Sequence, residues 1–285
     1  MKEKLDTRPS PIAGRWYADD PGELADSVDH YMQQAKLPDL PGEVIAIIAP
    51  HAGHIYSGPV AGYAFAALRG LAPEVVAVVS PVHQRYPQPL LSTAHQAYET
   101  PLGVIPVDVP AVLALEAALT RQLGYGLAYV RHDGEHSLEI ELPFLQRALP
   151  EGFQLLPVMV RDVRPAVVQA LGLGLAEALK GRKALLVAST DLSHYLPQPA
   201  ANELDAEALR RMEAFDPLGV LSMEDEGKGY ACGRAAVAAV LWAAQALGAD
   251  KVTQLHYATS GDVTHDYFEV VGYGAAAITR PAVAS

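Results

Sequence analysis

An uninterrupted apolar run at residues 44–49 restricts how this chain can fold, and Pro50 and His51 follow it directly. Six apolar, mostly β-branched residues in a row are typical of a strand that is buried on both faces of a sheet. Proline has no N–H to donate to the sheet, so the strand is expected to end at Pro50. His51 is then expected at the carboxyl end of the strand, where open α/β sheets bind their ligands.

The same pattern occurs twice more along the chain. Residues 75–79 form a second apolar run that leads to His83, and residues 184–188 form a third that leads to Asp191 and His194. Each of three buried strands would therefore deliver a histidine just beyond its carboxyl end. Because the carboxyl ends of parallel strands share one edge of a sheet, the pattern predicts a common site.

Helical and strand-like segments alternate between these runs. Further strands are expected at residues 153–160, 252–257 and 270–278, and helices at residues 21–35, 57–68, 111–123, 138–145, 166–179, 202–215 and 231–247. Pro143 should kink the helix at 138–145 or begin a new turn. The alternation predicts an α/β fold with a mainly parallel or mixed central sheet between two helical layers. No repeat and no Gly/Ser linker interrupts it, so residues 1–285 are expected to form a single domain.

Composition and charge exclude several classes of protein. The formal net charge of −12 argues against non-specific nucleic-acid binding, which needs a basic surface. No apolar run approaches the roughly 20 residues that a membrane span needs, and the N-terminus lacks an apolar signal region, so we expect a cytoplasmic protein. The single cysteine, Cys232, excludes an intrachain disulfide.

Five residues of the predicted site have metal-binding side chains: His51, His83, Asp191, His194 and Cys232. Catalytic metal sites typically use three protein ligands and keep one position open. Two histidines and one anionic ligand form the facial triad of non-haem iron proteins, with thiolate here as a possible replacement for carboxylate. Cys232 lies at the start of an expected helix, where exposed N–H groups and the helix dipole would favour the thiolate. The alternatives are a buried, inert cysteine and histidines that serve only as hydrogen-bonded structural residues.

A second group of polar residues, Glu135, His136 and Ser137, opens the expected helix at 138–145. The carboxylate and the imidazole suit acid/base work, or the orientation of a metal ligand. Alternatively, Ser137 caps the helix and Glu135 favours its positive end. Both interpretations stand on the sequence alone. His54, Tyr56 and Tyr98 would either orient a substrate or pack in the core.

Together these motifs resemble the Memo family over nearly the whole chain. They are, in order, Ala13-Gly14-Arg15-Trp16-Tyr17, Pro50-His51-Ala52-Gly53, Ser80-Pro81-Val82-His83, Glu135-His136-Ser137-Leu138-Glu139, Ser189-Thr190-Asp191-Leu192-Ser193-His194, Cys232-Gly233-Arg234 and Tyr257-Ala258-Thr259-Ser260. One such motif would be weak evidence, but this many in the family's order is specific.

The resemblance implies a three-layer α/β/α fold related to the class III extradiol (LigB-type) dioxygenases, built around one deep pocket. Those enzymes hold Fe(II) with two histidines and a glutamate. The Memo pattern implies His51 and His83 as metal ligands with Cys232 in place of the carboxylate. It also implies that His194, Asp191 and His136 line the same pocket, and that AMMECR1-like and radical-SAM proteins are partners.

Three functions are consistent with these residues. The first is a metal-dependent oxidoreductase of an unknown small-molecule substrate, with His194, Asp191 and His136 as catalytic residues and Fe(II) as the expected metal. The second is a non-catalytic metal-binding or redox-sensing protein, for which Cys232 would suit copper or zinc. The third is a module that binds a peptide or another partner in the same pocket. Retained acid/base residues favour the first.

Overall fold

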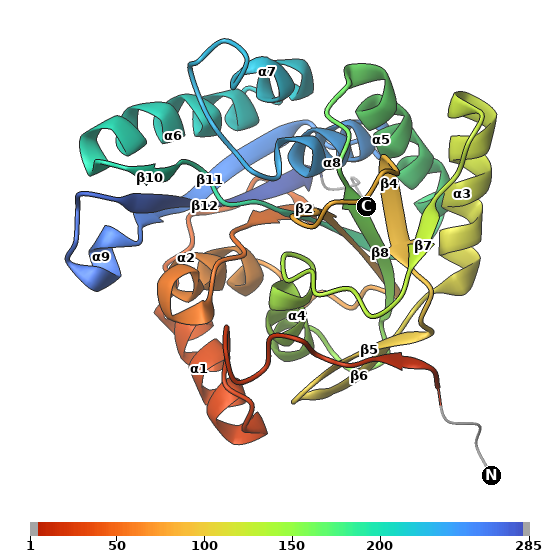
Figure 1. The fold of residues 1–285 in the computed structure, drawn as a ribbon, viewed down its shortest axis with the longest axis horizontal. Helices are drawn as coiled ribbons and strands as arrows, with labels where there is room; N and C mark the ends of the chain where they lie inside the picture. The colour runs from red at the N-terminus through yellow and green to blue at the C-terminus, as the bar shows by residue number, and fades with distance from the viewer. Residues whose placement is uncertain (1–4, 282–285) are drawn as a thin grey trace.

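The computed structural model describes residues 5–281 and shows a mixed central sheet flanked by helices (Figure 1). The predicted α/β class is therefore confirmed. The helices are α1 Pro21–Gln34, α2 His54–Ala66, α3 Val109–Leu123, α4 Leu142–Ala148, α5 Pro165–Leu179, α6 Gln198–Glu213, α7 Pro217–Ser222, α8 Arg234–Ala246 and α9 Gly261–Thr264. The strands are β1 Thr7–Arg8, β2 Glu43–Ala49, β3 Val75–Pro81, β4 Leu90–Thr93, β5 Ala97–Thr100, β6 Gly103–Pro106, β7 Ala128–Val130, β8 Gln154–Val160, β9 Ala184–Ser189, β10 His194–Leu196, β11 Lys251–Thr259 and β12 Val270–Arg280.

The large sheet has the strand order β10-β12-β2-β9-β3-β8-β4-β7, with β11 paired to β12. Its centre is a parallel block of β2, β9, β3 and β8. Antiparallel strands extend it on both sides, β12 next to β2 and β4 next to β8. Strands β1, β5 and β6 form a separate small sheet. The apolar runs thus form the centre of the sheet, where helices can cover both faces.

Helices α1, α2 and α4 cover one face of the large sheet, and α3, α5 and α8 cover the other (Figure 1). All seven residues of β3 are buried between the two layers. Small residues allow close packing of the second layer: a Cβ atom at Gly172 in α5 would lie 2.6 Å from the carbonyl oxygen of Ala239 in α8. No helix within residues 5–281 has both the length and the apolar character that a membrane span requires.

Several helix starts differ from the prediction, and α6, for example, begins at Gln198, four residues before the expected start. Helix α2 begins at His54, three residues before the expected start, because the backbone N–H of Ser57 already donates to the carbonyl oxygen of Gly53. Pro59 therefore lies inside the helix. The expected helix at 138–145 is a 3₁₀ turn, Glu139–Glu141, followed by α4, with Pro143 in the first turn of α4. Proline fits that position because the first N–H groups of a helix have no intrahelical partner.

Candidate metal centre

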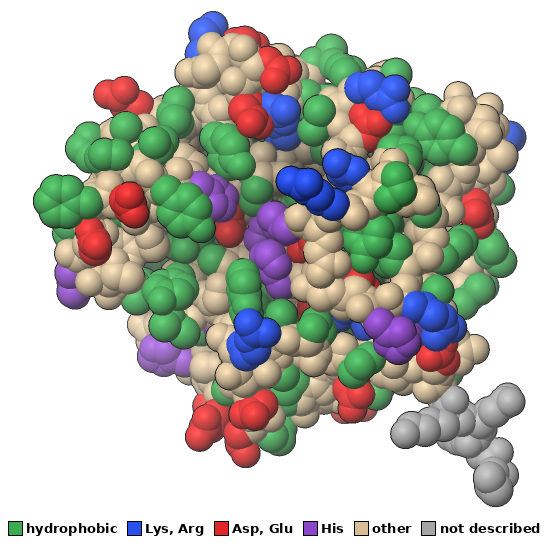
Figure 2. Space-filling view, in the orientation of Figure 1, with side chains coloured by type: hydrophobic (Ala, Val, Ile, Leu, Met, Phe, Trp, Pro, Cys, Tyr) green, Lys and Arg blue, Asp and Glu red, His purple; other side chains and the backbone are tan. Residues whose placement is uncertain are grey.

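The three strands that lead to histidines are neighbours in the sheet. Ala49 at the end of β2 pairs with Ser189 of β9, and Val79 of β3 pairs with Ala188. The loops after β2, β9 and β3 therefore begin side by side at one sheet edge. Figure 2 shows histidine side chains gathered in a hollow near the middle of this face.

The buried His51 is held at both its backbone and its ring. Its backbone N–H donates to Asp191 Oδ1 at 2.8 Å, and its Nδ1 lies 2.8 Å from Ser189 Oγ. Ser189 Oγ is also 2.7 Å from the carbonyl oxygen of Ser137. Because the single hydroxyl hydrogen of Ser189 is directed to that carbonyl, the hydroxyl accepts the Nδ1–H of His51. Nε2 of His51 then carries the lone pair that can bind a ligand, and the Sγ of Cys232 lies 3.2 Å from it.

Glu135 organises the other two histidines. Its carboxylate accepts the ring Nδ1–H of His83 at 2.9 Å and the backbone N–H groups of His83, His136 and Ser137. The His136 ring stacks on His83 with centroids 4.6 Å apart, and the Trp16 ring also lies against His136, at a centroid distance of 4.0 Å. Glu135 therefore orients imidazole rings, as one of the two interpretations of this motif requires.

The alternative interpretation, in which Ser137 caps a helix, is wrong. Ser137 Oγ donates to the carbonyl oxygen of Pro81 at 2.8 Å and makes no hydrogen bond to a helix N–H. The N-cap position of the 3₁₀ turn is Leu138, which has no capping side chain. Ser137 instead ties the loop of the histidine cluster to the end of β3.

His51, His83 and His136 form a group that could hold a metal ion. One nitrogen from each ring lies within 4.8 Å of the other two. This group, found among residues 5–281, contains two of the predicted ligands, His51 and His83. It does not contain the third predicted ligand, Cys232. His136 was expected to act in proton transfer, whereas the geometry also places it as a potential ligand.

Cys232 lies beside the cluster, and its Sγ is 3.2 Å from His51 Nε2. The residue precedes Gly233, the N-cap of α8, so it stands outside the first turn of the helix. Burial, followed by the nearby Asp191 carboxyl, raises the pKa of the Cys232 thiol. Loss of hydration at this buried position therefore opposes the thiolate that the sequence predicts there.

Asp191 and His194 complete the group that β9 delivers. Asp191 Oδ2 lies 3.9 Å from His51 Nε2, and burial raises the pKa of Asp191 to about 7. The Nδ1–H of His194 donates to the carbonyl oxygen of Leu192 at 2.7 Å, which leaves Nε2 as an acceptor. Burial lowers the pKa of His194, so the ring is neutral at neutral pH.

The three clustered imidazoles differ in charge. Burial, followed by the proximity of His136 and His83, holds the pKa of His51 well below its usual value. Burial likewise lowers the pKa of His136 to about 4. Burial also opposes protonation of His83, but the hydrogen bond and charge of Glu135 exceed it and raise the pKa of His83. Two of the rings are thus neutral, as metal binding requires.

Two buried carboxyl groups beneath the site were not predicted. A carboxyl oxygen of Glu141 lies 2.7 Å from Ser189 Oγ, and burial raises the pKa of Glu141 well above its usual value. Glu139 is bound by Arg8, which also pairs with Asp133 at 2.8 Å. The signal in the sequence is the alternation of glutamate with apolar residues from 138 to 142, which forces carboxyl groups into a buried segment.

Two of the other residues considered in the sequence pack in the core. His54 is buried, with Nε2 3.1 Å from the carbonyl oxygen of Ile140 and its ring 4.9 Å from that of Phe144. Tyr98 is also buried, and the guanidinium of Arg8 lies 5.0 Å from its ring centroid. Neither side chain reaches the histidine cluster through a hydrogen bond.

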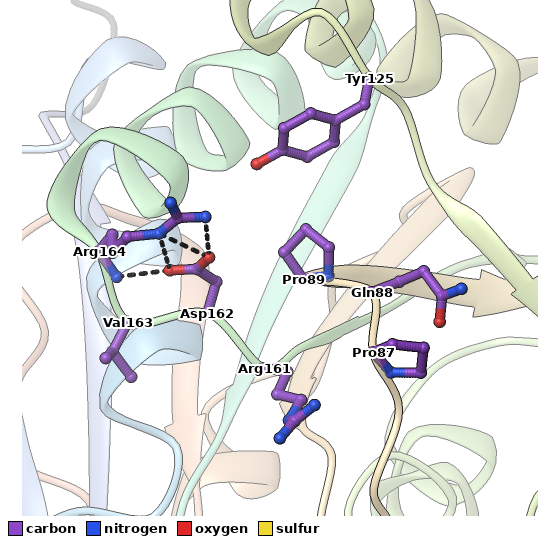
Figure 3. A pocket seen from close by; sticks show the side chains of 8 residues that line it. All are labelled: Pro87, Gln88, Pro89, Tyr125, Arg161, Asp162, Val163 and Arg164. Carbon is purple, nitrogen blue, oxygen red and sulfur yellow. Dashed lines mark hydrogen bonds and ion pairs between the residues drawn. The ribbon is translucent and has the colours of Figure 1, made fainter.

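A separate pocket of about 560 Å³ lies beyond the carboxyl end of β8 (Figure 3). Its lining residues are Pro87, Gln88, Pro89, Tyr125, Arg161, Asp162, Val163 and Arg164. The one carboxylate among them, Asp162, is bound by the guanidinium of Arg164, as the dashed lines show. This pocket contains none of the predicted site residues.

Comparison with known proteins gives a consistent result along the whole chain. A family model described as "Memo-like protein" matches residues 8–277. A MEMO1 family protein of Methanopyrus kandleri is 34% identical over 96% of this chain and 99% of its own length. A MEMO1 family protein of Methanothermobacter thermautotrophicus is 35% identical over 92% of this chain and 96% of its own length. A crystal structure of an uncharacterized Escherichia coli protein aligns with a TM-score of 0.48 and 14% identity, over 81% of this chain and 99% of that one.

Proposed function

This chain belongs to the Memo family, and we propose that it is a metal-dependent oxidoreductase whose metal is held by His51 and His83. The observation that carries the proposal is the mutual approach, within 4.8 Å, of one ring nitrogen each from His51, His83 and His136. His51 is buried, and burial of an imidazole is costly unless it is hydrogen-bonded or binds a ligand.

The donor atoms fit a metal. His51 and His83 each donate Nδ1–H to a fixed protein oxygen, on Ser189 and Glu135 respectively. Such outer hydrogen bonds fix the tautomer and the ring orientation of a metal-binding histidine, and they leave Nε2 as the ligand atom. Glu135 also brings negative charge close to the site, which favours a bound cation.

We propose Fe(II) as the metal and Cys232 as the third ligand, with copper or zinc as the alternatives. Two imidazoles and one anionic group suit non-haem iron, while a thiolate also suits copper and zinc. When bound, Fe(II) supplies one-electron chemistry and an open coordination position for a small molecule. Cys232 would have to lose its proton to bind, and His136 is the competing third ligand on geometric grounds.

The residues around the cluster can move protons. His194 accepts a proton at Nε2, because its Nδ1–H is already donated to Leu192. Asp191 can hold a proton at Oδ2, since its Oδ1 accepts the backbone N–H of His51 and its pKa is raised to about 7 by burial. Trp16 packs against the His136 ring and keeps water from that side of it. An acid and a base of this kind have no purpose in simple metal storage, which supports catalysis.

The proposal is tested by the metal content of protein purified without oxygen and supplied with Fe(II). Wild type should retain close to one iron per chain, and His51→Ala should lose it. His30→Ala is the matched control, because His30 is exposed on α1 and makes no hydrogen bond to the cluster. Equal iron in all three proteins would refute the site, and preferential retention of copper or zinc would refute the choice of iron.

A further inference from the structure

A second hollow of about 430 Å³ adjoins the histidine cluster. Three of its lining residues are direct neighbours of a candidate ligand or of the proposed base, His194. Trp16 packs on His136, Ala52 follows His51 in the chain, and Tyr195 follows His194. A molecule bound in this hollow would therefore lie next to the proposed metal and next to the proposed base.

Aromatic rings form much of the wall. Trp16, Tyr56, Tyr195 and Tyr273 come from four separate segments of the chain. Tyr195 is 71% exposed and has a φ of 57°, which a tyrosine rarely adopts. It interrupts the register of β10 with β12, so it is the extra residue of a bulge. Bulges next to active sites redirect side chains, and an exposed ring held at an unfavourable φ needs such a reason.

The charge of the hollow is negative. Its lining includes the carboxylates of Asp266 and Glu269 and one cationic group, Arg15. None of the three forms an ion pair with any residue from 5 to 281, so their charges are available to a ligand. Two negative groups against one positive group favour a cationic ligand over an anionic one.

The hydroxyl of a tyrosine also faces the hollow. Tyr273 is 2% exposed and lines the pocket, yet its hydroxyl has no hydrogen-bond partner in the described part of the chain. Burial raises the pKa of Tyr273, and the nearby Asp191, Tyr56 and Tyr195 raise it further. The hydroxyl opens onto the hollow, so it is available to donate or accept a hydrogen bond with a molecule bound there.

We propose that this hollow binds an organic ammonium group, such as the methylated or primary amine end of a substrate. Aromatic faces attract such cations through their quadrupoles, and the attraction is strongest where several rings surround the charge. Asp266 and Glu269 add a favourable charge interaction, and Tyr273 offers a hydrogen bond to a polar group attached to the cation. Binding of the ammonium group does not depend on the proposed metal centre. Only its role as the substrate of that centre rests on the proposed function.

Three probes of nearly equal shape test the charge preference. They are choline, its neutral isostere 3,3-dimethylbutan-1-ol, and the anion 3,3-dimethylbutanoate. Binding is followed by tryptophan fluorescence in chelator-treated protein, because Trp16 lines the hollow and the other tryptophan, Trp242, is buried in α8. Choline should bind at least about threefold more tightly than the neutral probe, and the anion should bind most weakly.

Substitutions of opposite sign sharpen the test. Glu269→Gln should weaken choline binding, and Arg15→Gln should strengthen it, while neither changes the affinity for the neutral probe. Tyr195→Ala should weaken choline binding more than it weakens binding of the neutral probe. Glu99→Gln is the matched control, because Glu99 is exposed on β5 and does not line the hollow.

Equal affinity for the three probes would overturn the proposal. So would tight binding of the anion, if Arg15→Gln abolished that binding.

The metal proposal fails separately. Because the probes bind without metal, His51→Ala should keep the choline affinity of the wild type. A protein that binds choline but retains no metal would refute the metal centre and leave the ammonium site standing.

Discussion

Removal of the Glu135 charge offers a direct test of how the histidine cluster is held. Glu135→Gln keeps the shape of the side chain and removes the carboxylate that accepts hydrogen bonds from His83, His136 and Ser137. Glutamine has one amide oxygen in place of two carboxylate oxygens, and its NH2 group must then face an N–H donor. A buried donor left without an acceptor costs about 1–3 kcal/mol of unfolding free energy at any pH.

The loss should be larger where His83 is protonated. A hydrogen bond to a charged partner contributes about 1.5–3 kcal/mol, and because 39% of the His83 side chain is exposed we take about 1.5 kcal/mol. The pKa of His83 is raised, so this contribution is fully present below 6.5 and is lost as the pH rises through the raised value. The pKa of Glu135 is strongly lowered by His83 despite burial, so its carboxylate stays charged across this range.

Equilibrium unfolding in urea, followed by circular dichroism after chelator treatment, measures both effects. At about pH 9 the variant should lose about 1–3 kcal/mol, and at about pH 6 it should lose about 1.5 kcal/mol more. Glu99→Gln, an exposed glutamate on β5, should unfold as the wild type does at both pH values. An equal loss at both pH values would refute the charged pair between Glu135 and His83.

Three further changes have defined outcomes. Cys232→Ser should lower iron affinity by more than the roughly 10- to 100-fold that is lost when a group hydrogen-bonded to a metal ligand is removed. Metal analysis of this variant and of His136→Ala compares the two residues, and a larger loss in His136→Ala would make His136 the third ligand. His194→Ala should keep the iron and lose substrate-dependent O2 consumption, and loss of iron would instead make His194 a ligand. Gly272→Ala would place a Cβ atom 1.8 Å from Asp205 Oδ2, so thermal unfolding should show a loss of about 2 kcal/mol or more.

The strands and their histidines were predictable because each signal is local. A run such as residues 75–79 has too few polar groups to lie anywhere but inside a sheet, and β3 is indeed buried along its length. The positions of His51 and His83 just after such runs then follow from chain geometry. The order of the motifs along the chain indicated the Memo family, and the family model that matches residues 8–277 confirms it.

The contacts that tune the site were not predictable in the same way. Glu141 approaches Ser189 across 48 residues of sequence, and Arg8 reaches Asp133 across 125. Neither pair has a periodic or motif signal, because their proximity depends on how separate loops pack. The raised pKa of Cys232 likewise follows from burial, which the residues beside it in the sequence do not reveal.

The α/β class, the buried strands and the residues able to bind a metal follow from side-chain chemistry and short-range pattern, so they could be read from the amino-acid sequence. The position of β9 between β2 and β3 depends on long-range packing, and it brings residues 51, 83 and 191 to one edge although they are far apart in the chain. The tertiary structure also placed His136 within ligand distance and left the Tyr273 hydroxyl facing a hollow. Strand order and loop packing are set by long-range burial, and no local stretch of sequence encodes them.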